Sequence, residues 1–376
     1  MKQGWEIKKL GEVATYVNGY AFKPEHWVEK GTPIIRIQNL NNPDVSYNYC
    51  DFDIPSKYIV ERGDILISWS ASLGVYEWEH EKGYLNQHIF KVVFDKGNIN
   101  KYYLKYAVSA KISDMLKNLH GATMKHIVKK DFDNTLIPVP TIAEQEKIVS
   151  ELDCLSGIIE KKKQQLKELD NLAQSIFYEM FGEHADGRDK WKIAKLGNVC
   201  KTTSGGTPSK GHPEYYEGGD IPWLRSGEVN KMNIHETELF ITEEGLSNSS
   251  AKWFPKGTVV IAMYGATVGQ VGILCNPMTT NQAICGIFPN ETFTPIYLYH
   301  FLLSKKPEYL EIATGGAQAN ISQNIVRDTV VSCPPLTLQQ DFASKIESIE
   351  KQKEQIAQSI KETETLFNSR MDYYFN

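Results

Sequence analysis

The alternation of apolar and polar residues divides the chain into segments of two kinds. Short runs rich in β-branched and aromatic residues, such as residues 63–69 (GDILISW) and 257–263 (GTVVIAM), lie between positions occupied by glycine, proline and asparagine. This pattern predicts short strands joined by turns. Helical spacing occurs at residues 101–119 and 295–312, whereas residues 141–181 and 337–373 contain no proline and almost no glycine. We therefore expect two α/β regions, each followed by a long helix.

The two long segments carry seam residues at alternating intervals of three and four, which is the heptad spacing of a coiled coil. One lysine interrupts each seam, which costs stability but can fix the register. Because each apolar stripe needs a partner, the simplest arrangement packs the helices against each other, and roughly 40 residues at about 1.5 Å each make a rod on the order of 60 Å long. Thr141 with Glu144, and Thr337 with Gln340, have the spacing of capping boxes at the two helix starts. The seams consist of Leu152, Leu155, Ile159, Lys162, Leu166, Leu169, Ala173, Ile176 and Met180, and of Phe342, Ile346, Ile349, Lys353, Ile356, Ile360, Thr363, Phe367 and Arg370.

The chain also contains an internal repeat displaced by about half its length. Residues 5–13 (WEIKKLGEV) return as residues 191–199 (WKIAKLGNV), and further matched pieces follow in the same order. Each half then closes with a proline pair ahead of its long helix. Because chance similarity does not preserve such an order, we interpret the chain as two copies of one unit. The further matches are PIIR at 33–36 with PWLR at 222–225, GDILI at 63–67 with GTVVI at 257–261, SASLG at 70–74 with GATVG at 265–269, NQ at 86–87 with 281–282, and YL at 103–104 with 297–298.

These patterns predict a mixed α/β protein of four parts. Residues 1–140 and 183–335 form the two repeated domains, and residues 141–182 and 336–376 form the long helices. The formal charge of −5 resides in the two helical segments, so the repeated domains are together neutral. A protein that coats nucleic acid through bulk positive charge is therefore excluded, whereas selective binding through a local basic face is not.

Composition narrows the cellular setting and the chemistry. No stretch approaches the roughly 20 apolar residues needed to cross a bilayer, and the amino-terminal residues lack the apolar core of a signal peptide, so we expect a cytoplasmic protein without a membrane partner. The six cysteines contain no CxxC pair, which argues against a zinc site or a redox dithiol. Dinucleotide-binding, P-loop, zinc-protease and serine-hydrolase motifs are all missing. The sequence thus predicts no catalytic residue and no metal site.

Candidate binding residues come from comparing the two copies. Asn86-Gln87 and Asn281-Gln282 can be read either as adenine-contacting amides or as buried supports, and their identity in both copies favours support. Residues that differ between the copies are better placed to face DNA bases. They follow the matched arginine in each copy or lie in the glycine-containing turns at 121–126 and 316–320. The loop at 204–210 has a lysine in the wrong position for a nucleotide phosphate loop, but its backbone can approach a DNA phosphate. The candidate DNA-binding residues are Arg36, Gln38, Asn39, Asn41, Trp69, Lys125, Ser204, Thr207, Lys210, Arg225, Ser226, Asn230, Tyr264, Gln318 and Asn320.

The arrangement of two repeated domains, each followed by prolines and a long helix, resembles the specificity subunit of type I restriction-modification systems. The marks of this resemblance are residues 5–13, 191–199, 140–148 (PTIAEQEKI) and 335–340 (PLTLQQ), and it covers nearly the whole chain. The second helix start carries Gln339-Gln340 where Glu144-Gln145 opens the first, which puts only a contact at that helix start in doubt.

The resemblance implies two target-recognition domains that each read one half of a bipartite double-stranded DNA site, held apart by an antiparallel coiled-coil pair in a pseudo-two-fold plan. It implies no catalytic centre and no cofactor in this chain. Two methyltransferase subunits and the restriction-translocase subunits are the implied partners, and they use S-adenosylmethionine, ATP and Mg²⁺. The alternatives are a specificity subunit of a modification-only system, a DNA methyltransferase in its own right, and a coiled-coil adaptor that assembles proteins.

Overall fold

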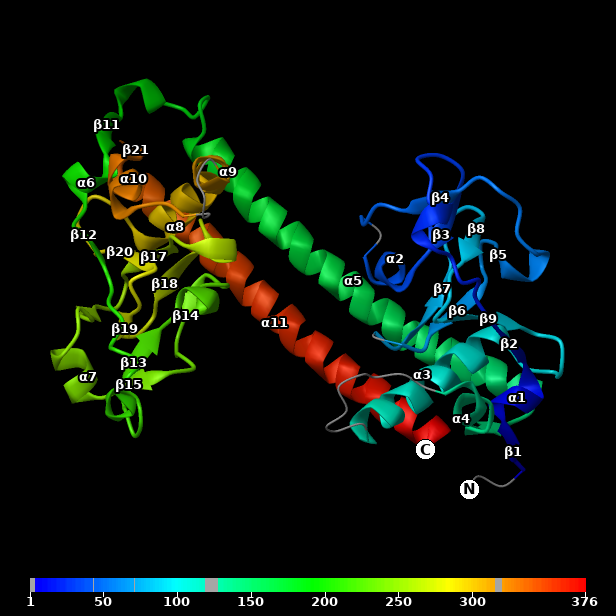
Figure 1. Ribbon diagram of the computed structural model, residues 1–376. Helices are drawn as coiled ribbons and strands as arrows, with labels where there is room; N and C mark the ends of the chain where they lie inside the picture. Colours follow the sequence, from blue (N-terminus) through cyan, green and yellow to red (C-terminus); the bar gives the residue numbers. More distant parts are fainter. Residues whose placement is uncertain (1–3, 43, 71, 119–127, 315–319) are drawn as a thin grey trace. The chain divides into compact units, whose positions relative to one another are not determined.

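The computed structural model describes residues 4–42, 44–70, 72–118, 128–314 and 320–376 (Figure 1). The chain divides into two compact units, and each unit contains part of both long helices. Unit 1 comprises Met1–Lys163 and Gln358–Asn376, and unit 2 comprises Gln164–Ala357. Both units mix strands with helices, which confirms the predicted mixed α/β class.

Unit 1 contains two four-stranded sheets and a two-stranded ribbon. The first sheet has the antiparallel order β2-β9-β6-β7, the second has the order β4-β3-β8-β5 with β3 and β8 parallel, and β1 pairs with β10. The run predicted as a strand at 63–69 is β6, which is buried along its whole length. The strands are β1 (Glu6–Lys9), β2 (Thr15–Asn18), β3 (Thr32–Ile35), β4 (Asn48–Cys50), β5 (Ile59–Val60), β6 (Ile65–Ser68), β7 (Gly74–Glu77), β8 (Gly83–Leu85), β9 (Ile89–Val93) and β10 (Leu136–Val139).

Unit 2 repeats this topology strand for strand. Its sheets have the orders β12-β20-β17-β18 and β15-β13-β19-β16, with β13 and β19 parallel, and β11 pairs with β21. One additional strand, β14, extends the first sheet beside β18. The shared strand order confirms that the sequence repeat is a structural repeat. The strands are β11 (Lys192–Lys195), β12 (Thr202–Ser204), β13 (Ile221–Leu224), β14 (Asn233–Ile234), β15 (Phe240–Ile241), β16 (Trp253–Phe254), β17 (Val259–Ala262), β18 (Val271–Leu274), β19 (Met278–Thr280), β20 (Ile284–Ile287) and β21 (Val330–Cys333).

Shorter helices complete each unit. The helix predicted at 101–119 is α3 (Lys101–Asn118), whereas the segment predicted as one helix at 295–312 forms two, α8 (Pro295–Ser304) and α9 (Lys306–Thr314). The break coincides with Pro307, because a proline is tolerated in the first turn of a helix but not in its interior. The remaining short helices are α1 (Leu10–Val13), α2 (Ile37–Asn41), α4 (Lys129–Asp133), α6 (Leu196–Val199), α7 (Glu243–Ser247) and α10 (Gln323–Asp328).

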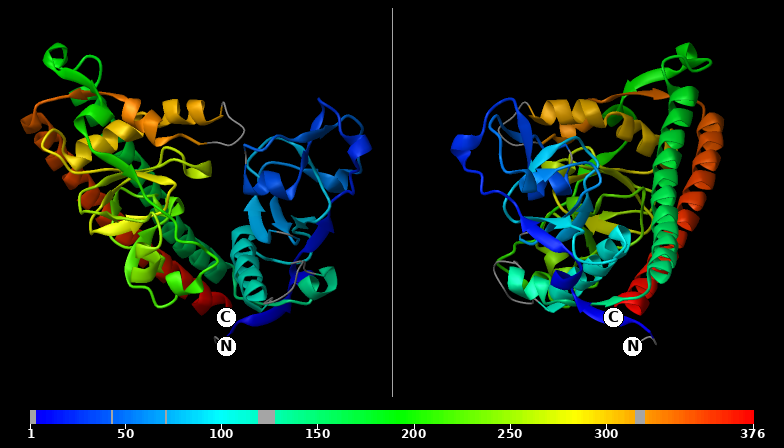
Figure 2. Two further views of the ribbon diagram at one scale, coloured as in Figure 1. Left: turned by 60° about the vertical axis from the view of Figure 1, so that its left-hand side comes forward. Right: turned by 90° about the vertical axis from the view of Figure 1, so that its right-hand side faces the viewer.

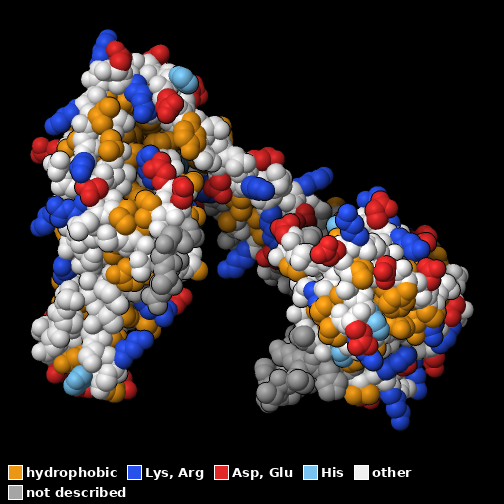
Figure 3. All heavy atoms as spheres, turned by 45° about the horizontal axis from the view of Figure 1, so that its top comes forward, with side chains coloured by type: hydrophobic (Ala, Val, Ile, Leu, Met, Phe, Trp, Pro, Cys, Tyr) orange, Lys and Arg blue, Asp and Glu red, His pale blue; other side chains and the backbone are white. Residues whose placement is uncertain are grey.

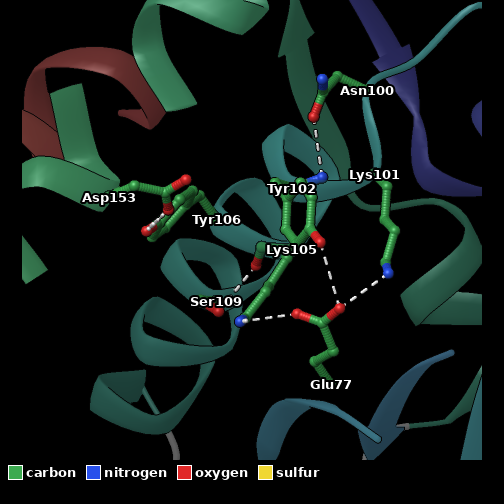
Figure 4. A network of polar contacts seen from close by, with 8 residues as sticks. All are labelled: Glu77, Asn100, Lys101, Tyr102, Lys105, Tyr106, Ser109 and Asp153. Carbon is green, nitrogen blue, oxygen red and sulfur yellow. Dashed lines mark hydrogen bonds and ion pairs between the residues drawn. The ribbon is translucent and has the colours of Figure 1, made fainter. Parts of the chain in front are cut away.

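Helix α3 is fixed to its surroundings in unit 1 by a network of polar contacts (Figure 4). Its start is capped by Asn100, whose Oδ1 accepts from the backbone N–H of Tyr102 at 2.9 Å. Glu77 of β7 accepts from Lys101 Nζ at 2.9 Å, and the Tyr106 hydroxyl donates to Asp153 of α5 at 2.6 Å. Helix α3 is therefore tied both to the sheet and to the long helix.

The two long helices are present as predicted, as α5 (Ile142–Phe181) and α11 (Leu336–Phe375). The capping box of α5 is confirmed, since Thr141 N–H donates to Glu144 Oε2 at 3.2 Å and Glu144 N–H donates to Thr141 Oγ1 at 3.4 Å. The box predicted from Thr337 and Gln340 is wrong: α11 begins one residue before Thr337, which leaves that threonine inside the helix.

A buried glutamine joins the first turn of each long helix to its own unit. Gln145 Oε1 accepts from Asn100 N–H at 2.8 Å, and its Nε2 donates to Pro140 O at 2.8 Å. Gln339 Oε1 accepts from Thr294 N–H at 2.8 Å, and its Nε2 donates to Pro334 O at 2.9 Å. Both side chains are fully buried, and their equivalence aligns Gln339, rather than Gln340, with Gln145. The glutamine contact is therefore made in both copies, whereas Leu338 occupies the position of Glu144 and cannot make its capping contact.

Within unit 1 the amino-terminal half of α5 packs against the carboxyl-terminal end of α11 (Figures 1 and 2). Arg370 and Glu151 form a bidentate ion pair, which Tyr374 joins through its hydroxyl. Lys162, the lysine that interrupts the first seam, donates to Ser359. Because residue numbers rise along α5 as they fall along α11, the two helices run antiparallel.

Within unit 2 the other halves of the two helices pack in the same way. Phe177 and Phe181 of α5 contact Phe342 of α11, with ring centroids 5.7 and 5.2 Å apart. Lys353, which interrupts the second seam, lies 2.7 Å from Asp170 Oδ1 of α5 and 2.7 Å from Glu350 Oε1 of its own helix. Phe177 and Phe181 lie beside the predicted seam rather than in it. The seam residues Ala173, Phe342, Ile346 and Ile349 belong to the same buried cluster as these rings, so the two helices bury apolar side chains against each other. Both interrupting lysines have polar partners.

Candidate DNA interface

Both units place an arginine and an Asn-Gln pair at the ends of two parallel strands. In unit 1, β3 is followed by Arg36 and β8 by Asn86-Gln87; the backbone N–H of Asn86 donates to Ile35 O at 3.2 Å. In unit 2, β13 is followed by Arg225 and β19 by Asn281-Gln282, and Asn281 N–H donates to Leu224 O at 2.9 Å. This repeated arrangement is called the arginine frame below. It brings together residues that lie about 50 positions apart in each copy.

In each unit a glycine directly after a strand, β2 or β12, lies against the backbone of the arginine frame. Gly19 N–H donates to Ile89 O at 3.0 Å after β2, and Gly205 N–H donates to Ile284 O at 3.2 Å after β12. A Cβ on Gly19 would lie 1.9 Å from Asn86 O, and one on Gly205 would lie 2.2 Å from Thr280 O. Only glycine allows the backbones to approach this closely.

The turn after each arginine is capped in the same manner. Arg36 N–H donates to Asn39 Oδ1 at 3.2 Å, and Arg225 N–H donates to Glu228 Oε1 at 3.1 Å. The Asn39 side chain is only 3% exposed, and its Nδ2 donates to Val45 O at 3.0 Å. The structure thus gives Asn39, one of the predicted DNA contacts, the role of an internal support for the turn.

The two arginine side chains differ in their partners. In unit 2 the Arg225 guanidinium lies 3.2 Å from Glu228 Oε1 and 2.6 Å from Glu238 Oε2. In unit 1 the Arg36 guanidinium lies over the Trp27 ring, 5.6 Å from its centroid, and among the described residues it has no carboxylate within ion-pair distance. Arg36 Nε is also buried without a hydrogen-bond partner in this part of the chain. Within the described residues no acid therefore compensates the charge of Arg36, while that of Arg225 is shared with two acids.

A cavity of about 390 Å³ in unit 2 collects several predicted residues from separate segments. Thr207, Lys210 and Arg225 all line it, and the Thr207 hydroxyl donates to Gln282 Oε1. The cavity combines positive side chains with amide and hydroxyl groups, which are the groups that bind DNA phosphates and base edges. The remaining lining residues are Tyr216, Trp223, Leu239 and Asn281.

The loop that carries Thr207 and Lys210 is anchored to the sheet below it. Trp223 Nε1 donates to Gly206 O at 3.0 Å, and the Tyr216 hydroxyl donates to Pro208 O at 2.5 Å. The identity of Gln282 in both copies indicated a buried support, yet its side chain is exposed at the cavity. Asn281 fits the supporting role better, although its Oδ1 is buried without a partner among the described residues.

Other predicted residues lie on the units at separate places. Gln38 and Asn41 are exposed on α2, where Asn41 Oδ1 accepts from the Tyr76 hydroxyl at 2.6 Å. The half-buried Trp69 donates through Nε1 to Asn18 Oδ1 at 3.1 Å and stacks on Phe90.

Unit 2 also has predicted residues that lie outside the cavity. Tyr264 is exposed and forms a backbone bridge with Asn320, so these two candidates are brought together. Ser204 donates to Gln323 Oε1 at 3.2 Å, and Ser226 opens the turn after Arg225.

Three candidates do not join these groups. Asn230 lines a different cavity of about 970 Å³, which runs along α5 and α11 within unit 2. Lys125 and Gln318 lie outside the described residues.

The charged groups on the face drawn in Figure 3 and the metal-binding groups of the described residues point to no further site. Figure 3 shows basic and acidic side chains interspersed on the visible face of both units, without a continuous patch of one sign. Among the residues that the structure describes, no cluster of three or more His, Cys, Asp or Glu side chains has the arrangement of a metal site. In the described segments, no helix combines the length and apolarity required to span a membrane.

Comparison with known proteins then identifies the family. The model of the type I restriction modification DNA specificity domain matches residues 2–171 and, a second time, residues 188–364. The chain belongs to this family. The double match coincides with the repeat seen in the sequence and in the strand order.

Named relatives of this family extend over nearly the full chain. The type I restriction enzyme EcoBI specificity subunit of Escherichia coli is 22% identical over 92% of this chain and 79% of its own length. The MjaVIII specificity subunit of Methanocaldococcus jannaschii is 26% identical over 96% of this chain and 91% of its own length.

Solved structures share the fold. A chain from a study of complex assembly and conformational transition of the type I restriction-modification system superposes with a TM-score of 0.61 at 19% identity, covering 99% of this chain and 97% of its own. The type I restriction-modification S subunit from M. genitalium gives a TM-score of 0.56 at 14% identity, covering 100% of this chain and 98% of its own. The long helix pair and two repeated units therefore belong to a known architecture.

Proposed function

We propose that this chain is the DNA-recognition subunit of a type I restriction-modification complex, in which each repeated unit reads one half of a bipartite double-stranded target. The observation that carries the proposal is the double family match, which assigns one DNA specificity domain to each copy. The arginine frame supports it, because both copies bring positive and amide side chains to the same place.

The long helices fit the role of a spacer between the two half-sites. Each helix is continuous over 40 residues, and at about 1.5 Å per residue that corresponds to roughly 60 Å. Helix α5 begins in unit 1 and ends in unit 2, so its length is part of the path between the two recognition domains. We further propose that the helix pair docks the methyltransferase subunits, with exposed side chains such as Leu172 and Leu366 as candidates for that contact.

The chemistry is proposed to reside in partner subunits. Two methyltransferase subunits would use S-adenosylmethionine, and restriction-translocase subunits would use ATP and Mg²⁺, in the cytoplasm where the DNA is. The cavity beside Arg225 is lined by amide, hydroxyl and cationic groups, which suit recognition of DNA. A modification-only system differs solely in lacking the nuclease partner.

The test is to express the chain with and without a methyltransferase subunit of a type I system from the same organism, and to map methylated adenines on genomic DNA. The proposal predicts a two-part motif with a fixed gap that appears only when both chains are present. Methylation by this chain alone would instead indicate an enzyme. Absence of any motif, together with no salt-dependent binding to duplex DNA, would favour a protein-assembly adaptor.

A further inference from the structure

The arginine frame is the part of the candidate interface that the two units share. The two frames correspond in their strand ends, in the hydrogen bonds that cap the turns and in the glycine beside them. Arg36 and Asn86 of unit 1 occupy the positions of Arg225 and Asn281 of unit 2. The residues that follow each arginine differ, since IQNL follows Arg36 where SGEV follows Arg225. The interface thus has a constant part and a variable part.

Two half-sites of different sequence share the repeating sugar and phosphate groups of the DNA backbone. Base edges differ from one half-site to the other, whereas the phosphodiester backbone is the same in both. A constant group of side chains in two otherwise different domains therefore fits a constant ligand. Arginine suits this ligand, because its planar guanidinium can donate two parallel hydrogen bonds to phosphate oxygens.

We propose that Arg36 and Arg225 each bind a phosphate of the DNA backbone, positioning their units on the duplex without selecting bases. The exposed Gln282 lies beside Arg225 on the same cavity, where its amide can donate to a neighbouring phosphate oxygen. This inference rests on the proposed function and assigns a role that the family match leaves open. The differing residues near each frame, such as Gln38 and Ser226, are left to read the bases.

Because the two arginines have different partners, their contributions to DNA binding should differ in size. Arg36 has no carboxylate to give up among the described residues, whereas Arg225 must exchange Glu238 for the phosphate. Glu238 is 72% exposed, so its ion pair is weak and can be replaced. Glu228 also caps the backbone N–H groups of Arg225 and Glu238, and it remains in place as part of the fold. Arg36 should therefore contribute more to binding than Arg225.

The experiment measures the dissociation constant of the complex with its methyltransferase partner as a function of salt, on a duplex carrying the methylated motif and on one with both half-sites scrambled. Arg36→Gln should weaken binding to both duplexes by a similar factor of about tenfold or more, as expected for hydrogen bonds to charged groups. Each lost phosphate contact should reduce the slope of log K against log salt by about 0.9. Arg225→Gln should act in the same direction with a smaller loss.

Matched variants separate contact from structure. Arg36→Lys should restore the slope because it keeps the charge, and Glu238→Gln should strengthen binding by about two- to fivefold because it releases Arg225. Arg62→Gln and Lys256→Gln remove a positive charge from exposed positions outside the frame and should leave the slope unchanged. Thermal unfolding of each variant identifies any that fail to fold.

Two results would overturn the proposal. An unchanged slope in folded Arg36→Gln and Arg225→Gln would show that neither arginine meets a phosphate. A changed base in one half of the methylated motif would show that the arginine selects sequence. Failure of the proposed function gives a different result, because the wild-type complex would then methylate no two-part motif at all.

Discussion

Protonation of His300 should weaken unit 2 as the pH falls, and the structure gives the size of the effect. The side chain lies on α8 and is 8% exposed, packed among Phe177, Tyr299 and Phe342, and its Nε2 has no hydrogen-bond partner among the described residues. Burial lowers the pKa of His300 to about 4, assisted by the positive charge of Lys353 and opposed by Asp170. The ring is therefore neutral in the folded protein at neutral pH.

The direction of the pH effect on stability follows from comparing the pKa of His300 in the folded and unfolded chains. In the unfolded chain the pKa of His300 is close to its ordinary value of 6.5, so that state takes up a proton below this pH while the folded state does not until the pH approaches about 4. Stability is thus retained above about 6.5 and lost as the pH falls. At 1.36 kcal/mol per pKa unit, His300 should cost about 2 kcal/mol at pH 5 and about 3 kcal/mol near pH 4.

Amide hydrogen exchange of α8, followed by mass spectrometry between pH 7 and pH 5, measures the local free energy of opening. His300→Phe keeps an aromatic ring and removes the titration, so the variant should lose about 2 kcal/mol less over this interval than the wild type. Helix α3 of unit 1 is an internal control, because the corresponding residue is Tyr106, whose pKa is raised by burial and which stays neutral. Equal pH dependence in wild type and variant would refute the argument.

Further predictions concern the frame and the helix pair. Gly205→Ala should destabilise unit 2 by about 2 kcal/mol or more, because its Cβ would overlap the Thr280 carbonyl. The midpoint of thermal unfolding should fall accordingly. Gln339→Ala should cost about 2 to 3 kcal/mol in urea unfolding, since it leaves the Thr294 N–H and the Pro334 carbonyl without their partner; an undiminished stability would mean that water replaces the side chain. Phe342→Ala should cost about 3 to 5 kcal/mol in the same assay because the fully buried ring contacts both Phe177 and Phe181, and a loss below about 1 kcal/mol would contradict the packing described between the two long helices.

The architecture could be predicted from the sequence because its signals are periodic and repeated. Heptad spacing indicated both long helices and their seams, and matched segments such as residues 5–13 and 191–199 indicated two copies. Periodicity is less informative where one residue decides an element boundary. Pro307 divides the helix predicted at 295–312, and Thr337 has the right spacing for a cap but lies inside α11.

The candidate site was harder to predict because hydrogen bonding, not residue type, decides which polar side chains face outward. Asn39 and Gln38 are neighbours of similar chemistry, yet Asn39 is buried as a cap and Gln38 is exposed. Identity between the copies also proved ambiguous. It indicated that both members of the Asn-Gln pair are buried supports of the fold, whereas Gln282 is exposed at the cavity. Residues can be identical in two copies because the copies bind the same ligand as well as because they share a scaffold.

The most direct test of the account inserts one heptad of seven residues into each long helix, beside Gln164 in α5 and at the facing position of α11, and then maps the methylated motif. Seven residues preserve the seam and add about 10 Å, which corresponds to roughly three base pairs at about 3.4 Å each. Two recognition units separated by a helical spacer predict that both half-motifs stay unchanged and the gap lengthens by about three base pairs. An active complex that methylates the original motif with its original gap would contradict the account.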